Sequence, residues 1–372
     1  MKILILGNNS DDFVGIRGEL LKAMADHGHQ LVLSGPAPLL PGTLEKTRTL
    51  SAEFHQIPLH PLSFNPVKEI FTFLSILDRI RHIKPEMVLL ITIKPIMYGS
   101  IAARIAGVRK IYSLNSGLGR LFSFSTIKEK LLFQLIRPIL KLAFKFNTRA
   151  FFQNHDDIDL YVEKEIIDPE KAVRVNGTGI DLKKFIYREN KIVGEIKVIM
   201  ISRLLKAKGV DFYCQAAKKI IDNYRGKVRF SLVGNFEYSK DAITRHELSN
   251  MVGDHVDYLG STNDVRPYLI DHNIFVLPSF YREGVPRVIM EAMATGMPVI
   301  TTDSVGCRDT INGKNGLLVS VKDVDSLYRA MEFFIKNTDK VEIMSAEGRK
   351  FVESKFDINQ VNQIMLSVMN LA

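Results

Sequence analysis

The 372-residue sequence predicts an α/β protein with two doubly wound parallel sheets, one in each half of the chain, that face a shared cleft. Two observations lead to this fold class. Short β-rich runs alternate with longer helical patterns, and most of these runs are apolar at every position, as in parallel strands covered on both faces. The alternation restarts after the polar segment 176–195, which indicates a boundary between two domains.

In the first half, the strands are expected at Lys2–Leu6, Leu31–Ser34, Met87–Thr92, Lys110–Ser113 and Ala150–Gln153. The helical patterns between them are Val14–His27, Val67–Ile83 and Met97–Ala106. In the second half, the strands are expected at Lys197–Ser202, Val228–Val233, Val256–Leu259, Ile274–Pro278 and Pro298–Thr302, and the helices at Gly209–Asn223, Val265–Asp271 and Pro286–Ala294. We therefore expect domains at 1–185 and 196–355, with a helix in 356–372 that packs back on the first domain.

The composition is that of a globular protein, with 46% hydrophobic and 24% charged residues. Two cysteines do not make a disulfide framework, and a reducing compartment follows as the expectation. No uninterrupted apolar run approaches the roughly 20 residues that span a bilayer. We expect a soluble, cytoplasmic protein.

The positive charge lies in the first part of the chain. Residues 1–150 contain 20 Lys and Arg against 10 Asp and Glu, whereas residues 151–372 contain 30 against 31, which accounts for the net charge of +9. An asymmetry of this kind indicates an anionic partner for the first part, either nucleic acid or a membrane surface.

The segment 120–149 narrows that choice. It interleaves Phe and Leu with the basic residues Lys128, Lys130, Arg137, Lys141 and Lys145. Such a helix can lie in the headgroup plane of an anionic membrane. The alternative is a partly buried helix whose lysines reach solvent from the core. Nucleic acid is not expected, because the aromatic residues are all Phe and lie on the apolar side.

The second half carries a candidate anion site at a strand-to-helix turn. Arg203 and Lys208 follow the expected strand that ends at Ser202, and Gly209 opens a helix. Cations beside free backbone N–H groups at a helix start suit a diphosphate. Ordinary solvated loop side chains are the alternative for this stretch taken alone.

A second candidate site is the stretch FYREGVPRVIMEAMATG, which also follows an expected strand. Pro286 is favoured in the first turn of a helix, so the amides of Gly284 and Val285 are expected to point into the cleft. Glu291 would then lie about 12 Å along the same helix from Glu283. One acid could meet the sugar of a nucleotide-sugar and the other its ribose.

These motifs resemble glycosyltransferase family 4, whose members are retaining enzymes with two Rossmann-like domains in a B-type glycosyltransferase fold. The resemblance rests on the Arg203-to-Lys208 turn and on PSFYREGVPRVIMEAMATGMPVITTDSVG. In the first half, TIKPIMYGSIAARIAGV, NSGLGRLF and FFQNHDDIDLYV resemble bacterial enzymes that add a sugar to an undecaprenyl-diphosphate-linked acceptor, some of which transfer N-acetylgalactosamine.

The resemblance implies roles for six donor-binding residues. Arg203 and Lys208 would hold the donor diphosphate, Glu291 would bond the ribose, and Glu283 with the Gly284 and Val285 amides would contact the transferred sugar and its phosphate. The catalytic set would be Glu283, Arg203 and Lys208. The activity implied is a hexosyltransferase that retains configuration and uses a UDP-sugar, with UDP-hexose and GDP-sugars as further options beside a UDP-N-acetylhexosamine.

The acceptor side departs from the family pattern. Many relatives have a histidine after the fourth strand, where this chain offers Asn115 or Ser116. The loop after the first strand reads GNNSDDFVG instead of the usual glycine-rich loop. Residues expected on the acceptor side are Asn8, Gly15, Arg17, Lys94, Asn115, Ser116 and Arg120.

No cofactor or metal is expected. The nine histidines lack metal-ligand spacing, and Asp157-Ile158-Asp159 is interpreted as a helix start and not as a metal-binding Asp-x-Asp. The function predicted is surface-polysaccharide synthesis (O-antigen or capsule) on a lipid-linked acceptor, peripheral on the inner face of the cytoplasmic membrane. A nucleotide-sugar epimerase of the same architecture and a non-catalytic membrane-associated scaffold are the alternatives.

Overall fold

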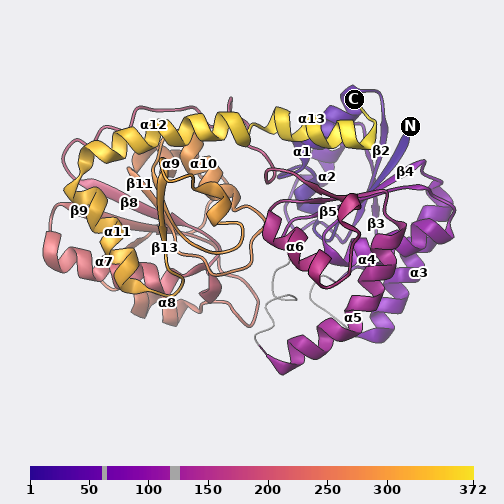
Figure 1. Ribbon diagram of the computed structural model, residues 1–372, viewed down its shortest axis with the longest axis horizontal. Coiled ribbons are helices and arrows are strands. Elements are labelled where there is room, and N and C mark those ends of the chain that lie inside the picture. The colour runs from indigo at the N-terminus through magenta and orange to yellow at the C-terminus, as the bar shows by residue number, and fades with distance from the viewer. Residues whose placement is uncertain (61–64, 118–125) are drawn as a thin grey trace. The chain divides into compact units, whose positions relative to one another are not determined.

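The computed structural model describes residues 1–60, 65–117 and 126–372, which form two compact units (Figure 1). Unit 1 comprises Met1–Thr178 and Ile358–Ala372, and unit 2 comprises Gly179–Asp357. Each unit contains one parallel sheet with helices packed on it.

The sheet of unit 1 has the strand order β3-β2-β1-β4-β5-β6-β7 and is parallel in every pairing. Its strands are β1 (Lys2–Leu6), β2 (Gln30–Gly35), β3 (Glu53–Gln56), β4 (Met87–Ile91), β5 (Lys110–Asn115), β6 (Arg149–Phe152) and β7 (Ala172–Arg174). The first three strands extend the sheet in one direction and the last four in the other. The topological switch point, where ligands of such sheets bind, therefore lies between β1 and β4.

Successive residues of the unit 1 strands pack on opposite faces of the sheet, which explains why the strands are apolar throughout. Leu4 and Leu6 join the core cluster under α3, α4, α5 and α6, whereas Ile3 and Ile5 join the cluster under α1 and α13. The helices of this unit are α1 (Gly18–Asp26), α2 (Thr43–Thr49), α3 (Pro66–Ile83), α4 (Ile93–Ile105), α5 (Ile127–Phe146), α6 (His155–Glu163) and α13 (Ile358–Met369), with 3-10 turns η1 (Ser10–Phe13) and η3 (Pro169–Lys171).

Unit 2 has the order β10-β9-β8-β11-β12-β13, again parallel, with its switch point between β8 and β11. Its strands are β8 (Ile196–Ile201), β9 (Val228–Val233), β10 (Asp257–Tyr258), β11 (Ile274–Leu277), β12 (Val299–Thr302) and β13 (Gly316–Val319). Its helices are α7 (Val210–Tyr224), α8 (Arg245–Val252), α9 (Arg266–Asp271), α10 (Arg287–Thr295), α11 (Val324–Lys336) and α12 (Thr338–Lys355), with 3-10 turns η4 (Lys206–Lys208) and η5 (Arg308–Thr310). The predicted fold class, two doubly wound parallel α/β domains, is confirmed.

The sequence and the structure differ at some element boundaries. Helix α1 begins at Gly18 and not at Val14, because Asn9 caps the short turn η1 first. Helix α4 begins at Ile93, several residues before the expected Met97. The edge strands β3, β7 and β13 have no counterpart among the expected strands. They are three or four residues long and partly exposed, so they lack a continuous apolar pattern.

The segment that connects the two sheets belongs to unit 2 from Gly179 onward. Asn190 anchors it, because its buried amide donates to the carbonyl oxygens of Asn273 and Gly296 at 2.7 and 2.9 Å. Asn273 donates back to Asn190 at 3.1 Å. The C-terminal helix α13 is part of unit 1, where it packs on α1.

Candidate active site

The turn between β8 and α7 carries Arg203 and Lys208. Arg203 follows β8 directly, and its side chain is exposed. Lys208 ends the turn η4 and is 8% exposed. Gly209 then adopts a φ of 81°, and a Cβ at this position would collide with the carbonyl oxygen of Pro278, just after β11. Glycine is therefore needed where this turn passes the neighbouring strand end.

Lys208 and Glu283 form an ion pair at the carboxyl edge of the unit 2 sheet. The ammonium of Lys208 donates to Oε1 of Glu283, and both side chains are nearly buried. Ser279 Oγ donates to the same carboxylate oxygen at 3.1 Å, and the Tyr281 ring centre lies 5.4 Å from Lys208 Nζ. Because β8 and β11 are neighbours at the switch point, the fold brings these predicted residues together from positions 75 apart.

Glu283 lies in the loop before α10 and not on the helix. Pro286 has an extended ψ of 112° and occupies the N-cap position, so α10 begins at Arg287. The expectation that Glu283 and Glu291 occupy one helix is therefore wrong. Their separation is set by the loop and cannot be calculated from helical geometry. Gly284 and Val285 are buried in this loop.

Glu291 is buried and paired with Arg287. Arg287 Nε donates to Glu291 Oε1 at 2.8 Å, one helical turn away. Burial raises the pKa of Glu291, and the adjacent guanidinium opposes that rise, while the charge of Asp264 adds to it. Nη1 of Arg287 is buried without a hydrogen-bond partner among the residues that the structure describes.

The end of β12 and the loop after it contact the loop that carries Glu283. Thr302 Oγ1 and Ser304 Oγ both donate to the carbonyl oxygen of Ser279, the latter at 2.9 Å. Gly306 has a φ of 79°, and a Cβ there would collide with the carbonyl oxygen of Gly284. The sequence motif TTDSVG, which carries no predicted role, therefore positions the predicted loop.

Several of these contacts are missed by sequence reasoning. Ser279, Tyr281 and Arg287 all lie within or beside FYREGVPRVIMEAMATG, and the sequence alone assigns them no function. Spacing gives a signal only for Arg287, which stands four residues before Glu291 and so on the same helical face.

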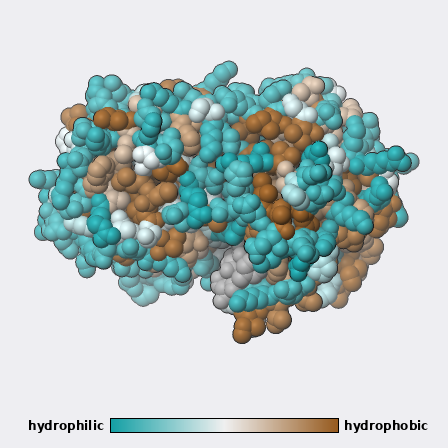
Figure 2. All heavy atoms as spheres, viewed as in Figure 1, coloured by the Kyte–Doolittle hydropathy of each residue, from teal (hydrophilic) through white to brown (hydrophobic). Residues whose placement is uncertain are grey.

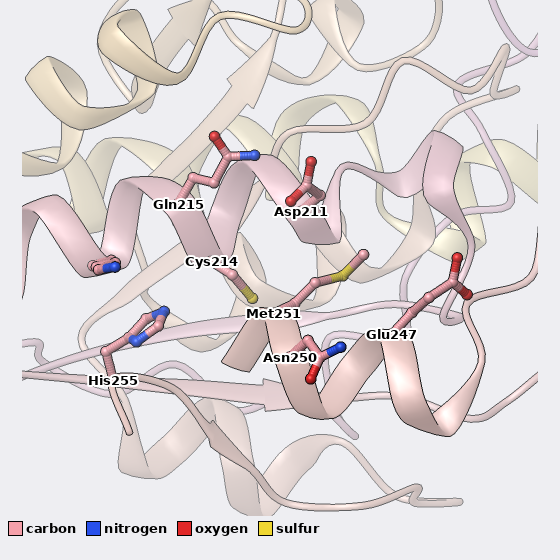
Figure 3. Close-up of a pocket in the computed structure, with 8 residues that line it drawn as sticks. Asp211, Cys214, Gln215, Glu247, Asn250, Met251 and His255 are labelled. Atoms are coloured by element: carbon pink, nitrogen blue, oxygen red, sulfur yellow. The ribbon is translucent and has the colours of Figure 1, made fainter. Parts of the chain in front are cut away.

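Figure 3 shows a separate pocket of unit 2, with a volume of about 370 Å³, between α7 and α8. Asp211, Cys214, Gln215, Lys218, Glu247, Asn250, Met251 and His255 line it. None of these is a predicted site residue.

Burial raises the pKa of the Cys214 thiol to about 12, and that of the Cys307 thiol to about 11, so neither is a nucleophile at neutral pH.

On unit 1, the structure joins two of the predicted acceptor-side residues. Arg17, after β1, is 6% exposed and donates to Ser116 Oγ, after β5, at 2.6 Å. Asn115 is buried at the end of β5, and its Oδ1 has no hydrogen-bond partner among the described residues. Asn8 is half-buried and Gly15 is exposed in the loop after β1.

Lys94 lies inside α4 near its start and is 4% exposed. Its ammonium is 2.8 Å from Glu69 Oε1 and donates to the carbonyl oxygen of His60 at 2.8 Å. Tyr98 donates to the other oxygen of Glu69 at 2.7 Å, and burial together with this bond raises the pKa of the phenol. Glu69 therefore balances the charge of Lys94.

The predicted basic residues of α5 differ in their surroundings. Lys130 and Lys145 are exposed. Arg137 donates to the carbonyl oxygen of Lys164 at 2.8 Å, and both Arg137 and Lys141 lie within 3.5 Å of Glu165. Arg120 and the side chain of Lys128 lie outside the described part of the structure.

Asp157 lies in the first turn of α6, which Asn154 caps. Its backbone N–H donates to Asn154 Oδ1 at 2.8 Å, and the Asn154 amide donates to its carboxylate at 3.1 Å. Asp159 is exposed on the same helix. The interpretation of Asp157-Ile158-Asp159 as a helix start is confirmed.

Two family models match the chain over most of both sheets. The model described as "Glycosyl transferase 4-like" matches residues 2–154, and that described as "Glycosyl transferases group 1" matches residues 195–337. This chain is therefore a glycosyltransferase, with a 4-like part followed by a group 1 part. The sequence-based prediction of this glycosyltransferase family is thereby confirmed.

Two curated relatives resemble this glycosyltransferase along most of its length. The N,N'-diacetylbacillosaminyl-diphospho-undecaprenol alpha-1,3-N-acetylgalactosaminyltransferase of Campylobacter jejuni is 25% identical, over 99% of this chain and 98% of the relative. The UDP-Gal:alpha-D-GlcNAc-diphosphoundecaprenol alpha-1,3-galactosyltransferase of Escherichia coli is 28% identical, over 78% of this chain and 77% of the relative.

A solved structure shares the fold of the glycosyltransferase. The crystal structure of Anabaena HepE in complex with UDP superimposes with a TM-score of 0.77 at 17% identity, covering all of both chains. At this identity the likeness concerns the fold alone. It agrees with the predicted B-type fold of two Rossmann-like domains.

Proposed function

We propose that this glycosyltransferase transfers a hexose or N-acetylhexosamine from a UDP-sugar to a polyprenyl-diphosphate-linked glycan during surface-polysaccharide synthesis. The observation that carries the proposal is the Lys208–Glu283 pair at the switch point of unit 2, with the exposed Arg203 in the same turn between β8 and α7. The names of the two relatives, which describe sugar transfer to diphospho-undecaprenol, support the acceptor class. The UDP complex of HepE supports the nucleotide.

The pair supplies complementary functions for a nucleotide-sugar. Lys208 and Arg203 would balance the charge that develops on the departing diphosphate, and Glu283 would accept hydrogen bonds from hydroxyls of the transferred sugar. Glu291 would accept from the ribose. A negatively charged diphosphate competes with Glu283 for Lys208, so donor binding would loosen the ion pair and release the carboxylate toward the sugar.

Retention of configuration fits the state of Glu283. Its carboxylate is engaged by Lys208 and Ser279, which suits hydrogen bonding to the sugar better than attack on its anomeric carbon. In the front-face reaction, the bond from the anomeric carbon to phosphate breaks with its electron pair going to UDP. The acceptor oxygen forms the new bond on the same face, and its proton passes to the leaving phosphate oxygen. Positioning does most of the work in such a step.

Unit 1 would hold the acceptor. Arg17 is fixed against Ser116 near the switch point between β1 and β4, where ligands of doubly wound sheets bind. A guanidinium in this position suits an acceptor diphosphate. The excess of 20 basic over 10 acidic residues in positions 1–150 favours an anionic acceptor on an anionic surface.

Helix α5 would place the enzyme on the inner face of the cytoplasmic membrane. It buries Phe133, Ile136, Leu140 and Phe144 in the core of unit 1. On its opposite side it exposes Ile127, Leu131, Leu135, Ile139 and Leu142, by 37 to 76%. A helix with an apolar stripe toward solvent and lysines beside it is suited to the headgroup region of a bilayer. Within the described residues, no helix is long and apolar enough to cross a membrane.

The test is transfer of radiolabelled sugar from UDP-glucose, UDP-galactose and their N-acetylated forms to polyprenyl-diphosphate-linked N-acetylglucosamine. We expect one donor to give product, with the anomeric configuration of the donor preserved in its NMR spectrum. Glu283→Ala and Lys208→Ala should abolish transfer with the fold intact.

Lys206→Ala is the matched control, since Lys206 lies in the same turn but is exposed and paired with Glu247. Wild-type turnover in either site variant would contradict the site. A product formed from UDP-sugar without any acceptor would indicate a nucleotide-sugar epimerase instead.

A further inference from the structure

Helix α3 exposes an apolar stripe that the sequence alone does not reveal. Val67, Ile70, Phe71 and Leu74 are 62, 60, 65 and 50% exposed, whereas Thr72, Ile76 and Ile80 face the core. All four exposed residues lie in the first half of the helix. In Figure 2, brown spheres gather on the side of unit 1 where α3 runs and at the bottom of the view, over the first turns of α5.

We propose that the stripe of α3 is a second membrane contact, which acts together with α5 to seat unit 1 on an anionic bilayer. The inference rests on the proposed membrane location. It adds α3 to the membrane contact and gives the orientation of unit 1 on the bilayer. The two helices pack on the same helix, α4, and contribute to the same core cluster on one face of the sheet. Their exposed stripes therefore belong to one side of unit 1.

The charges around both stripes suit an anionic lipid surface. The first three turns of each helix contain one acid, Glu69 in α3 and Glu129 in α5. Glu69 is turned inward to Lys94 and Tyr98, and Glu129 closes the capping box with Thr126. The exposed Lys68 and Lys130 lie beside the stripes. Cations beside an inserted apolar face strengthen binding to anionic headgroups.

The geometry also sets which end of the sheet approaches the membrane. In a parallel sheet the connecting helices start at the carboxyl edge of the strands, so the first turns of α3 and α5 lie toward that edge. With 20 residues, α5 is about 30 Å long, whereas the six residues of β5 span about 20 Å. The first turns of α5 accordingly form the lowest part of unit 1 in Figure 1. The carboxyl edge, with Arg17 and Ser116, would face the interface where a lipid-linked diphosphate lies.

The test is co-sedimentation of the full-length enzyme with vesicles of equal parts phosphatidylglycerol and phosphatidylcholine. An α3 variant (Ile70→Ser, Phe71→Ser, Leu74→Ser) is compared with an α5 variant (Leu131→Ser, Leu135→Ser, Leu142→Ser). The control carries three exposed apolar substitutions in unit 2, Ile186→Ser, Val193→Ser and Ile343→Ser, at positions 72, 90 and 52% exposed. We expect the α3 variant to lower the vesicle partition coefficient about tenfold or more and the control to leave it unchanged.

Each other outcome is decisive. Loss of binding in the α5 variant with full binding in the α3 variant would overturn the inference and leave the membrane location standing. If the wild-type enzyme does not bind these vesicles, both the α3 contact and the membrane location are wrong. Glycosyl transfer to a short-chain, water-soluble acceptor would still report on the active site. Sedimentation velocity compares the oligomeric states of the wild-type enzyme and the α3 variant. If the wild-type enzyme is a dimer and the α3 variant is a monomer that still binds vesicles, the stripe binds a second copy of the chain and the inference is wrong.

Discussion

Lys208 and Glu283 meet at the ends of β8 and β11, the two neighbouring strands at the switch point of unit 2. Each is the other's charged partner in a nearly buried setting. Removing one partner of such a pair leaves an uncompensated charge. Variants of the two residues should therefore affect the binding of UDP and the turnover of a UDP-sugar differently.

We expect Glu283→Gln to retain UDP binding and to lower kcat by about 10²–10³-fold, a loss typical of a group that acts on the developing transition state. UDP has no transferred sugar, and its phosphates gain access to Lys208 once the competing charge is removed. Lys208→Met should instead weaken UDP binding. Calorimetry with UDP and turnover with UDP-sugar measure the two effects, and equal losses of both in each variant would contradict this division of roles.

Glu291 is expected to bind the ribose of the donor, and its burial also affects the stability of the fold. Burial raises its pKa above the ordinary 4.5, so the folded state binds the proton more tightly than the unfolded chain. The contribution of Glu291 to stability is therefore most favourable below the unfolded pKa and is lost as the pH rises through the folded pKa. Glu291→Gln removes this penalty. It should raise the free energy of unfolding at pH 7, and the gain should vanish at pH values below about 4.

The same variant should weaken UDP binding, because an amide cannot replace a carboxylate toward two ribose hydroxyls. Urea denaturation at the two pH values and calorimetry at neutral pH measure the two effects. A variant that is less stable at pH 7 would show that the Arg287–Glu291 pair outweighs the burial of the carboxylate.

Gly306 is expected to control the position of the Glu283 loop. Gly306→Ala adds a Cβ against the carbonyl oxygen of Gly284, and the loop must shift to accept it. We expect a loss of turnover together with about 2 kcal/mol of stability. Gly313→Ala is the control, because Gly313 has a similar φ of 82° and its Cβ would meet no atom within 4 Å. Thermal unfolding and turnover should distinguish the crowding of Gly306 from the φ strain that both variants share.

Charge balance by Arg203 and Lys208 predicts that transfer proceeds without a bound metal. Full activity is expected in the presence of excess EDTA, with a metal-dependent glycosyltransferase in the same assay as the control that loses activity. A loss that added Mg²⁺ or Mn²⁺ restores would show that a cation shares the work of the two side chains.

Much of the candidate active site could be predicted because strand ends are visible in the sequence. Arg203, Lys208 and Glu283 each follow a continuous apolar run, and side chains at such positions gather at the carboxyl edge of a parallel sheet. The start of α10 could not be predicted to the residue, since proline is compatible with both an N-cap and a first helical turn. The short edge strands were missed because half-exposed strands lack an apolar pattern.

The sequence by itself determined the two-domain α/β fold, the family and the residue types of the candidate donor site. Only the tertiary structure decided that β8 and β11 are neighbours, so that Lys208 meets Glu283, and that Gly306 lies behind Gly284. It also decided that Phe71 of α3 faces solvent while Ile76 faces the core. The physical reason is that periodicity groups residues onto the faces of one helix or strand, whereas packing against other elements decides which of those faces is covered.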